Sequence, residues 1–203
     1  MAIELWIFVR KITGNNTEIE MIASKTITLP NWINEEINEK ILLVSTEDKM
    51  KFVLDLATKN VKKKSGGPFA AAVFNGETNE LIALGLNCVV DNNSSIAHAE
   101  VVALTLAQEK LKTFRLADEL ILVSSAQPCV MCTGAVLWSG VKTLIYGATK
   151  EDVEEIVGFD EGPLHPNWVE EFEQRGIKVI GKILNKESRQ ALQLYKDNEG
   201  ILY

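Results

Sequence analysis

The alternation of apolar and polar residues along the chain predicts regular helices and strands after residue 45. The first helix begins near Thr46, which we interpret as its N-cap because Glu47 and Asp48 place acidic charge in the first turn. Apolar residues follow at helical spacing, namely Met50, Val53, Leu54, Ala57 and Val61. Three lysines and the segment Ser65–Pro68 then end this helix.

Two apolar, strand-like segments follow at Phe69–Phe74 and Leu81–Val90, and the polar residues between them indicate a β-hairpin. Farther along, helices are predicted at His98–Leu111, Cys129–Trp138, Glu151–Val157, Asn167–Arg175 and Glu187–Tyr195, and strands at Glu119–Ser124, Val141–Tyr146 and Ile177–Ile183. Such alternation is typical of a largely parallel sheet covered by helices on both faces. The pattern therefore predicts an α/β fold that includes the antiparallel hairpin.

Residues 1–45 lack this regularity, and Pro30 and Trp32 lie in a turn-like stretch of them. We interpret residues 1–45 as an N-terminal extension and residues 46–203 as one domain. The apolar stretch of residues 1–9 carries Glu4, has no basic n-region and is followed by no small-residue cleavage site, so no secretory signal is predicted. Met21 is an alternative start of the protein.

Composition narrows the class of protein further. With 46% hydrophobic and 24% charged residues among 203, the chain is typical of a globular protein, and no stretch approaches the roughly 18 apolar residues of a membrane span. The net charge of −7 disfavours nucleic acid as a partner. Three cysteines in a chain of this length indicate a reducing compartment, which we take to be the cytoplasm. They also indicate thiols that bind a metal or take part in catalysis rather than form disulfides.

Two short motifs at the starts of predicted helices carry the candidate chemistry. One is His98-Ala99-Glu100, and the other is Pro128-Cys129-Val130-Met131-Cys132. The two cysteines are three residues apart, so their sulfurs share one helical face, and the helix N-terminus favours the thiolates that zinc needs. With His98 as the third ligand, Cys129 and Cys132 form a set that leaves a fourth position open, as in catalytic zinc sites.

Glu100 is the candidate proton shuttle beside this metal. Zinc lowers the pKa of a bound water, which can become hydroxide near neutral pH, and Glu100 would carry its proton to the ring nitrogen and the leaving amine. The pattern H-x-E followed by P-C-x-x-C is the signature of zinc deaminases. We interpret His165, in a turn-like segment, and Cys88, in a strand-like one, as structural.

From about Lys49 onward, the chain resembles the cytidine/deoxycytidylate deaminase superfamily and, within it, the small zinc-dependent bacterial guanine deaminases. Besides the zinc motifs, the resemblance rests on Gly66-Gly67-Pro68-Phe69, Asn87, Gly134-Ala135, Gly158-Phe159-Asp160-Glu161 and Tyr203. It implies a three-layer α-β-α fold with a mixed five-stranded sheet. It also implies a homodimer, in some members with the C-terminal segment crossing to the partner.

The resemblance also implies roles for individual residues. His98, Cys129 and Cys132 would bind zinc, and Glu100 and Glu161 would be catalytic, Glu161 also pairing with N–H groups of the base. The base would be held by Phe69 and Trp138 at its ring, Asn87 and the Ala99 N–H at its polar edges, and Tyr203 closing the pocket. Plain structural roles remain open for Trp138, Asn87, Glu161 and Tyr203. Gln127 stands where the family commonly has glutamate, which removes a charge near the metal.

The implied reaction is hydrolytic deamination of a free purine base, guanine giving xanthine and ammonia, with a small nucleobase as partner. Guanosine, cytosine or an aminated triazine are alternative substrates. A tRNA adenosine deaminase shares the zinc motifs, but Lys150–Tyr203 holds 12 acidic and 7 basic residues and would repel phosphates. A zinc-stabilised protein without activity would instead need a fourth protein ligand and no Glu100.

Overall fold

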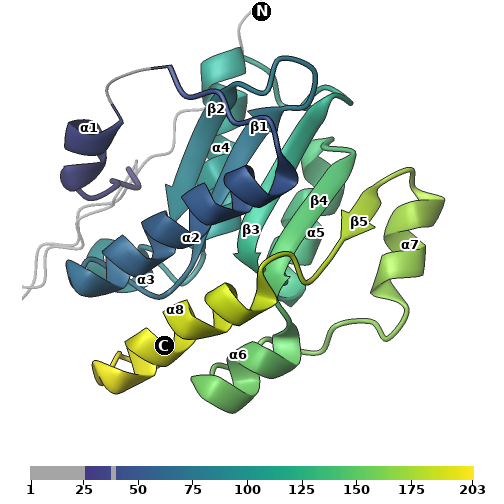
Figure 1. The fold of residues 1–203 in the computed structure, drawn as a ribbon. Helices are drawn as coiled ribbons and strands as arrows, with labels where there is room; N and C mark the ends of the chain where they lie inside the picture. Colours follow the sequence, from purple (N-terminus) through teal and green to yellow (C-terminus); the bar gives the residue numbers. More distant parts are fainter. Residues whose placement is uncertain (1–25, 38–39) are drawn as a thin grey trace, which may run out of the picture.

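The computed structural model describes residues 26–37 and 40–203 and is built on one five-stranded sheet (Figure 1). The strands are β1 (Ala70–Asn75), β2 (Leu81–Leu86), β3 (Leu120–Ala126), β4 (Thr143–Ala148) and β5 (Lys178–Ile180). The helices are α1 (Trp32–Glu36), α2 (Thr46–Lys62), α3 (Val89–Asn92), α4 (Ala99–Leu111), α5 (Val130–Ser139), α6 (Lys150–Ile156), α7 (Trp168–Gln174) and α8 (Asn185–Asp197). In the part of the chain that the structure describes, no helix is both long and apolar enough to cross a membrane.

The sheet has the order β2-β1-β3-β4-β5 and is mixed. β1 pairs antiparallel with β2 and β3, whereas β4 pairs in parallel with β3 and β5. Helices α2 and α8 cover one face and α4 and α5 the other (Figure 1), so the three-layer fold with a mixed five-stranded sheet is confirmed. Because β2, β3 and β4 run in the same direction, their carboxyl ends meet at one edge of the sheet, where β1 begins.

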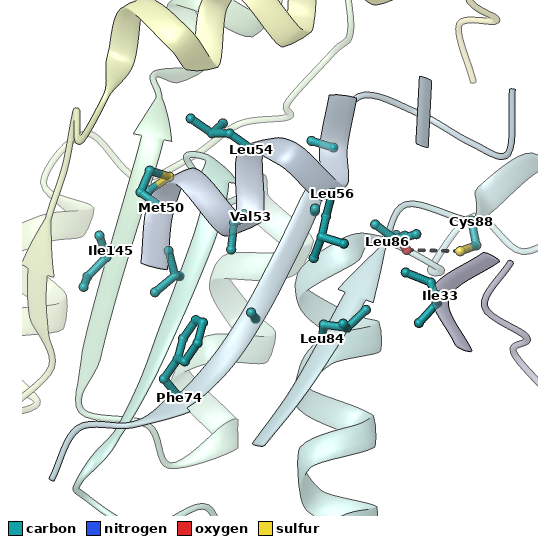
Figure 2. Close-up of a cluster of buried hydrophobic side chains, with 14 of the residues drawn as sticks. Ile33, Met50, Val53, Leu54, Leu56, Phe74, Leu84, Leu86, Cys88 and Ile145 are labelled. Carbon is teal, nitrogen blue, oxygen red and sulfur yellow. Dashed lines mark hydrogen bonds between the residues drawn. The ribbon is translucent and has the colours of Figure 1, made fainter. Parts of the chain in front are cut away.

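The side chains of β1 alternate between two hydrophobic cores, one on each face of the sheet. Ala72 and Phe74 belong to the core beneath α2, where Figure 2 shows Met50 and Val53 of that helix above the strands. Ala71 and Val73 belong to the core beneath α4. A strand buried on both faces has apolar residues at consecutive positions, which explains its uninterrupted hydrophobic sequence.

Two predicted boundaries differ from the structure for local reasons. Ser45, rather than Thr46, caps α2, because its Oγ accepts a hydrogen bond from the Asp48 N–H at 3.0 Å. β2 ends at Leu86, earlier than predicted, and the chain then turns into the short helix α3. Cys88 is buried at this turn and directs its thiol to the Leu86 carbonyl (Figure 2), so its structural role is confirmed although it lies outside the strand.

The turn-like stretch predicted around Trp32 is instead the one-turn helix α1. Trp32 and Ile33 are buried in the core beneath α2. Leu42 forms an isolated antiparallel bridge with Glu80, which brings the chain back beside β2. The described part of residues 1–45 is therefore packed against the sheet domain.

Candidate active site

The candidate zinc ligands lie where two helices begin at one edge of the sheet. His98 is the N-cap of α4, and Cys129 is the N-cap of α5, which follows β3 after three residues. Cys132 lies one turn into α5, and its backbone N–H donates to Cys129 Sγ at 3.5 Å. The predicted placement of both motifs at helix starts is confirmed.

The geometry of these three side chains fits zinc. His98 Nδ1 lies 3.6 Å from Cys129 Sγ and 3.6 Å from Cys132 Sγ, and the three atoms lie within 4.8 Å of one another. Tetrahedral bonds of about 2.3 Å to sulfur and about 2.05 Å to nitrogen would separate such atoms by about 3.6 Å. No fourth histidine, cysteine or carboxylate joins the group among the described residues, so one coordination position remains for water or substrate.

The two thiols differ in pKa, and that of Cys129 suits a cation. A hydrogen bond from the Cys132 side chain, opposed by burial and helped by His98, lowers the pKa of Cys129 to about 4. The hydrogen bond with Cys129 and burial raise the pKa of Cys132. Cys129 is therefore a thiolate at neutral pH, the form in which cysteine binds metals.

Glu100 is buried in the first turn of α4, beside the zinc ligands. The Ser124 hydroxyl, from β3, donates to its Oε1 at 3.1 Å and orients the carboxyl group. Burial, and then the negative charge of Cys129, raise the pKa of Glu100. A carboxyl group in this environment can hold a proton and pass it on.

Glu161 is a second protonatable carboxyl group at the same site. Burial, followed by the charges of Cys129 and Glu100, raises the pKa of Glu161 to about 8. Its backbone carbonyl accepts a hydrogen bond from the Val130 N–H at 3.1 Å, which ties the loop after α6 to the start of α5. The loop therefore brings Glu161 to the metal ligands rather than leaving it as a solvated turn residue.

One cavity contains most of the predicted site residues. Its lining includes Phe69, Asn87, His98, Glu100, Cys129, Glu161 and Tyr203, together with Ala126, Gln127, Phe159 and Asp160, which were not predicted as site residues. The Phe159 ring lies 5.6 Å from that of Phe69 and 4.8 Å from that of Tyr203, measured between centroids. These rings give the cavity an aromatic wall, and the Gly158–Glu161 motif contained the signal for Phe159.

Gln127, at the cavity wall, is a neutral amide where the family commonly has a charged glutamate. Its Oε1 accepts a hydrogen bond from the Lys150 N–H at 3.3 Å, so the start of α6 satisfies the side chain. Its own backbone N–H donates to the Ala148 carbonyl at 2.8 Å. The residue thus links β3 to the end of β4 without adding negative charge beside the thiolate.

Trp138 does not line this cavity, so it does not reach the expected place against the ring of the base in its own chain. It follows Cys132 by six residues, which rotates it about 240° around the helix axis, and its side chain is 88% exposed.

Ala99 is fully buried next to His98, and donation of a hydrogen bond by its backbone N–H to the base stays a prediction. His165 is exposed in a turn, where its Nδ1 accepts from the Asn167 N–H, and its structural role is confirmed.

Comparison with known proteins agrees with this geometry. Residues 44–148 match the family model of the cytidine and deoxycytidylate deaminase zinc-binding region. A solved structure of guanine deaminase from Nitrosomonas europaea is 44% identical, with a TM-score of 0.82, over 88% of this chain and 99% of that chain. Guanine deaminase of Bacillus subtilis is 36% identical over 63% of this chain and 80% of the relative. A tRNA-specific adenosine deaminase of Buchnera aphidicola is 31% identical over 59% of this chain and 75% of the relative.

Proposed function

Because the chain belongs to the cytidine and deoxycytidylate deaminase family of zinc-dependent hydrolases, we propose that it deaminates a free purine base, converting guanine and water to xanthine and ammonia. The observation that carries the proposal is one cavity that joins the zinc-ligand set to two protonatable carboxyl groups and an aromatic wall. The two guanine deaminases, at 44% and 36% identity, indicate the substrate.

His98, Cys129 and Cys132 would hold the zinc, which activates water as the nucleophile when it is bound. Glu100, oriented by Ser124, takes the proton of the water and delivers it to the ring nitrogen and then to the leaving amine. Burial keeps this carboxyl group away from bulk water, so the proton passes between Glu100 and the substrate.

The rest of the cavity suits a flat base with several hydrogen-bonding edges. Phe69 and Phe159 contact the faces of the ring, and Tyr203 closes one side of the cavity. The Asn87 amide bonds one edge of the base and the Ala99 N–H another, while Glu161 accepts from the ring N–H or amino group. A base that leaves these buried groups unpaired would be rejected strongly.

Incubation of the zinc-loaded protein with guanine, while ammonia and xanthine are measured, tests the proposal. The Glu100→Gln variant should lose about 10²–10⁴-fold in kcat while its zinc content stays the same. His165→Gln, in an exposed turn, is the matched control and should keep full activity. Faster turnover of guanosine, cytosine or an aminated triazine than of guanine would refute the substrate assignment, and full activity of Glu100→Gln would refute the proton shuttle.

A tRNA substrate is the alternative within the family, and the charge distribution disfavours it. The terminal region Lys150–Tyr203 has five more acidic than basic residues, and it forms the loop after α6 that reaches the cavity. Phosphates beside a flipped-out base would meet this negative charge. Salt-sensitive binding of tRNA, with adenosine deamination, would support the alternative.

We further propose a homodimer in the cytoplasm, with residues 46–203 as the catalytic domain. Val130, Leu137 and Trp138 leave an apolar surface on α5, which a second copy would cover. All three cysteines are free, as a reducing compartment favours. Sedimentation of the wild type and of Trp138→Ser tests the dimer, which the substitution should weaken, and cell fractionation tests the location.

A further inference from the structure

We propose that the N-terminal segment of residues 26–37 positions the substrate-binding side of the cavity through a chain of hydrogen bonds from Trp32 to Asn87. The inference rests on the proposed function in so far as Asn87 contacts the base. Trp32 lies outside the 44–148 region that matches the family model, and it does not line the cavity. Its role would be that of a positioning residue.

Three side chains form this Trp32 relay. Trp32 Nε1 donates to Ser65 Oγ at 3.0 Å, and Ser65 Oγ donates to Asn60 Oδ1 at 2.8 Å. Asn60 Nδ2 then donates to two backbone carbonyls, that of Gly67 at 2.9 Å and that of Asn87 at 3.0 Å. Asn60 and Asn87 are 0% and 1% exposed, so the end of the relay is shielded from water.

The donor and acceptor chemistry gives the relay a single direction. The indole N–H can only donate, so the Ser65 hydroxyl accepts from Trp32 and has its own proton left for Asn60. Asn60 Oδ1 therefore accepts, and its amide nitrogen faces the carbonyls of Gly67 and Asn87. Without the indole N–H, the Ser65 hydroxyl loses one of the partners that fix its position, so its bond to Asn60 Oδ1 is held less firmly.

The N-terminal segment is attached to the same part of the fold at a second place. The Thr28 N–H donates to Asn92 Oδ1 at 2.9 Å, and Asn92 Nδ2 returns a bond to the Thr28 carbonyl at 3.1 Å. Ile33 lies beside Leu86 and Cys88 in Figure 2, next to the residues that flank Asn87. The segment thus contacts the chain immediately before and after the substrate-binding asparagine.

The close packing around Asn87 means that small displacements matter. A Cβ built on Gly67 would lie 3.1 Å from Asn87 Oδ1 and would also meet the Tyr203 hydroxyl, so the asparagine side chain is closely surrounded. Asn87 lines the cavity, whereas Glu100 is held separately by the bond from Ser124. Loosening the relay should therefore weaken binding of the base while leaving the proton shuttle intact.

The test removes single donors and keeps the side chains' bulk. Trp32→Phe retains an aromatic ring beneath Lys63, whose Nζ lies 5.7 Å from the indole, but loses the N–H. Ser65→Ala breaks the next link. Each variant should raise KM for guanine about 3- to 10-fold, the equivalent of one net hydrogen bond, with kcat within about twofold and zinc content unchanged. The double variant should be no worse than either single one, because both break the same chain.

Trp168→Phe is the matched control, since Trp168 is also buried but packs on the other side of the sheet against Tyr146 and Phe172. It should leave KM unchanged. Hydrogen–deuterium exchange provides a readout that needs no substrate: the backbone N–H groups of residues 65–67, 69 and 87–92 should exchange faster in Trp32→Phe than in the control. If wild-type protein did not deaminate guanine, the proposed function would fail while this exchange result would still test the relay. Unchanged exchange, an unchanged KM, or additive effects in the double variant would overturn the inference.

Discussion

Replacing Asp152 by alanine should destabilise the protein by about 2–3 kcal/mol, because one buried carboxylate joins two helices. Asp152 completes a capping box at the start of α6: its Oδ2 accepts from the Thr149 N–H at 2.9 Å, and its own N–H donates to Thr149 Oγ1. From α8, Asn185 Nδ2 donates to the same carboxylate at 2.7 Å, and Arg189 forms an ion pair with it. Loss of the carboxylate therefore affects both helices.

The magnitude follows from these separate contacts. Thr149 still caps the helix in this variant, so the loss at α6 is the bond from the Thr149 N–H to the carboxylate, which costs about 1 kcal/mol. Loss of the bond from Asn185 to a charged group costs about 1.5 kcal/mol or somewhat more. The Arg189 side chain is 44% exposed, so its ion pair with Asp152 should add only a few tenths of a kcal/mol. For a domain of this size, the total corresponds to a decrease in Tm of about 4–12 °C.

Chemical denaturation and calorimetry of the zinc-loaded protein would measure the change. Asp152→Asn should be intermediate, because an amide oxygen can still accept at the cap but carries no charge. Asp197→Ala is the control: this exposed residue of α8 accepts a hydrogen bond from Gln193 Nε2, and its loss should change stability by less than about 0.5 kcal/mol. Equal stability of Asp152→Ala and Asp197→Ala would refute the reasoning.

Further predictions concern the metal, the cavity and the cores. A chelator should abolish activity and added zinc should restore it, whereas recovery without any metal would contradict the assigned ligands. Gly67→Ala should raise KM about tenfold or more by overpacking against Asn87 and Tyr203, with zinc content as the control. Phe74→Ala should cost about 3–5 kcal/mol in denaturation, since the ring is fully buried. Burial raises the pKa of Cys88 to about 11, so the folded thiol stays protonated while that of the unfolded chain ionises near pH 9. The free energy of unfolding should therefore fall between about pH 9 and 11. Denaturation at both pH values should show that this fall is about 1–2 kcal/mol smaller in Cys88→Ala than in the wild type.

The zinc ligands could be predicted from sequence because their positions depend mainly on local structure. His98 and Cys129 each precede a helix, and the spacing from Cys129 to Cys132 brings the two sulfurs together whatever the surrounding fold. The strands could be predicted for a similar reason, because short runs of consecutive apolar residues between turn residues are typical of buried strands.

Other features depend on contacts that sequence spacing does not describe. The direction of Trp138 follows from how α5 is rotated on the sheet, and Phe159 reaches the cavity only because its loop docks at the start of that helix. Helix α1 has five residues, too few to show a period, and its contact with Ser65 joins residues 33 positions apart. Asn60 did leave a signal, a polar residue three positions after Ala57 on the buried face of α2.

The zinc-ligand set and part of the cavity wall belong to parts of the chain with different tolerance to change. His98, Glu100, Cys129 and Cys132 occupy the first turns of two helices fixed to the sheet, whereas Phe159 and Glu161 belong to the loop between α6 and α7. Loops accept substitutions and insertions that helix starts do not. Directed evolution confined to residues 158–161 should therefore alter which amino-substituted heterocycle is accepted while metal loading is retained, which makes the scaffold a starting point for deaminases of new specificity.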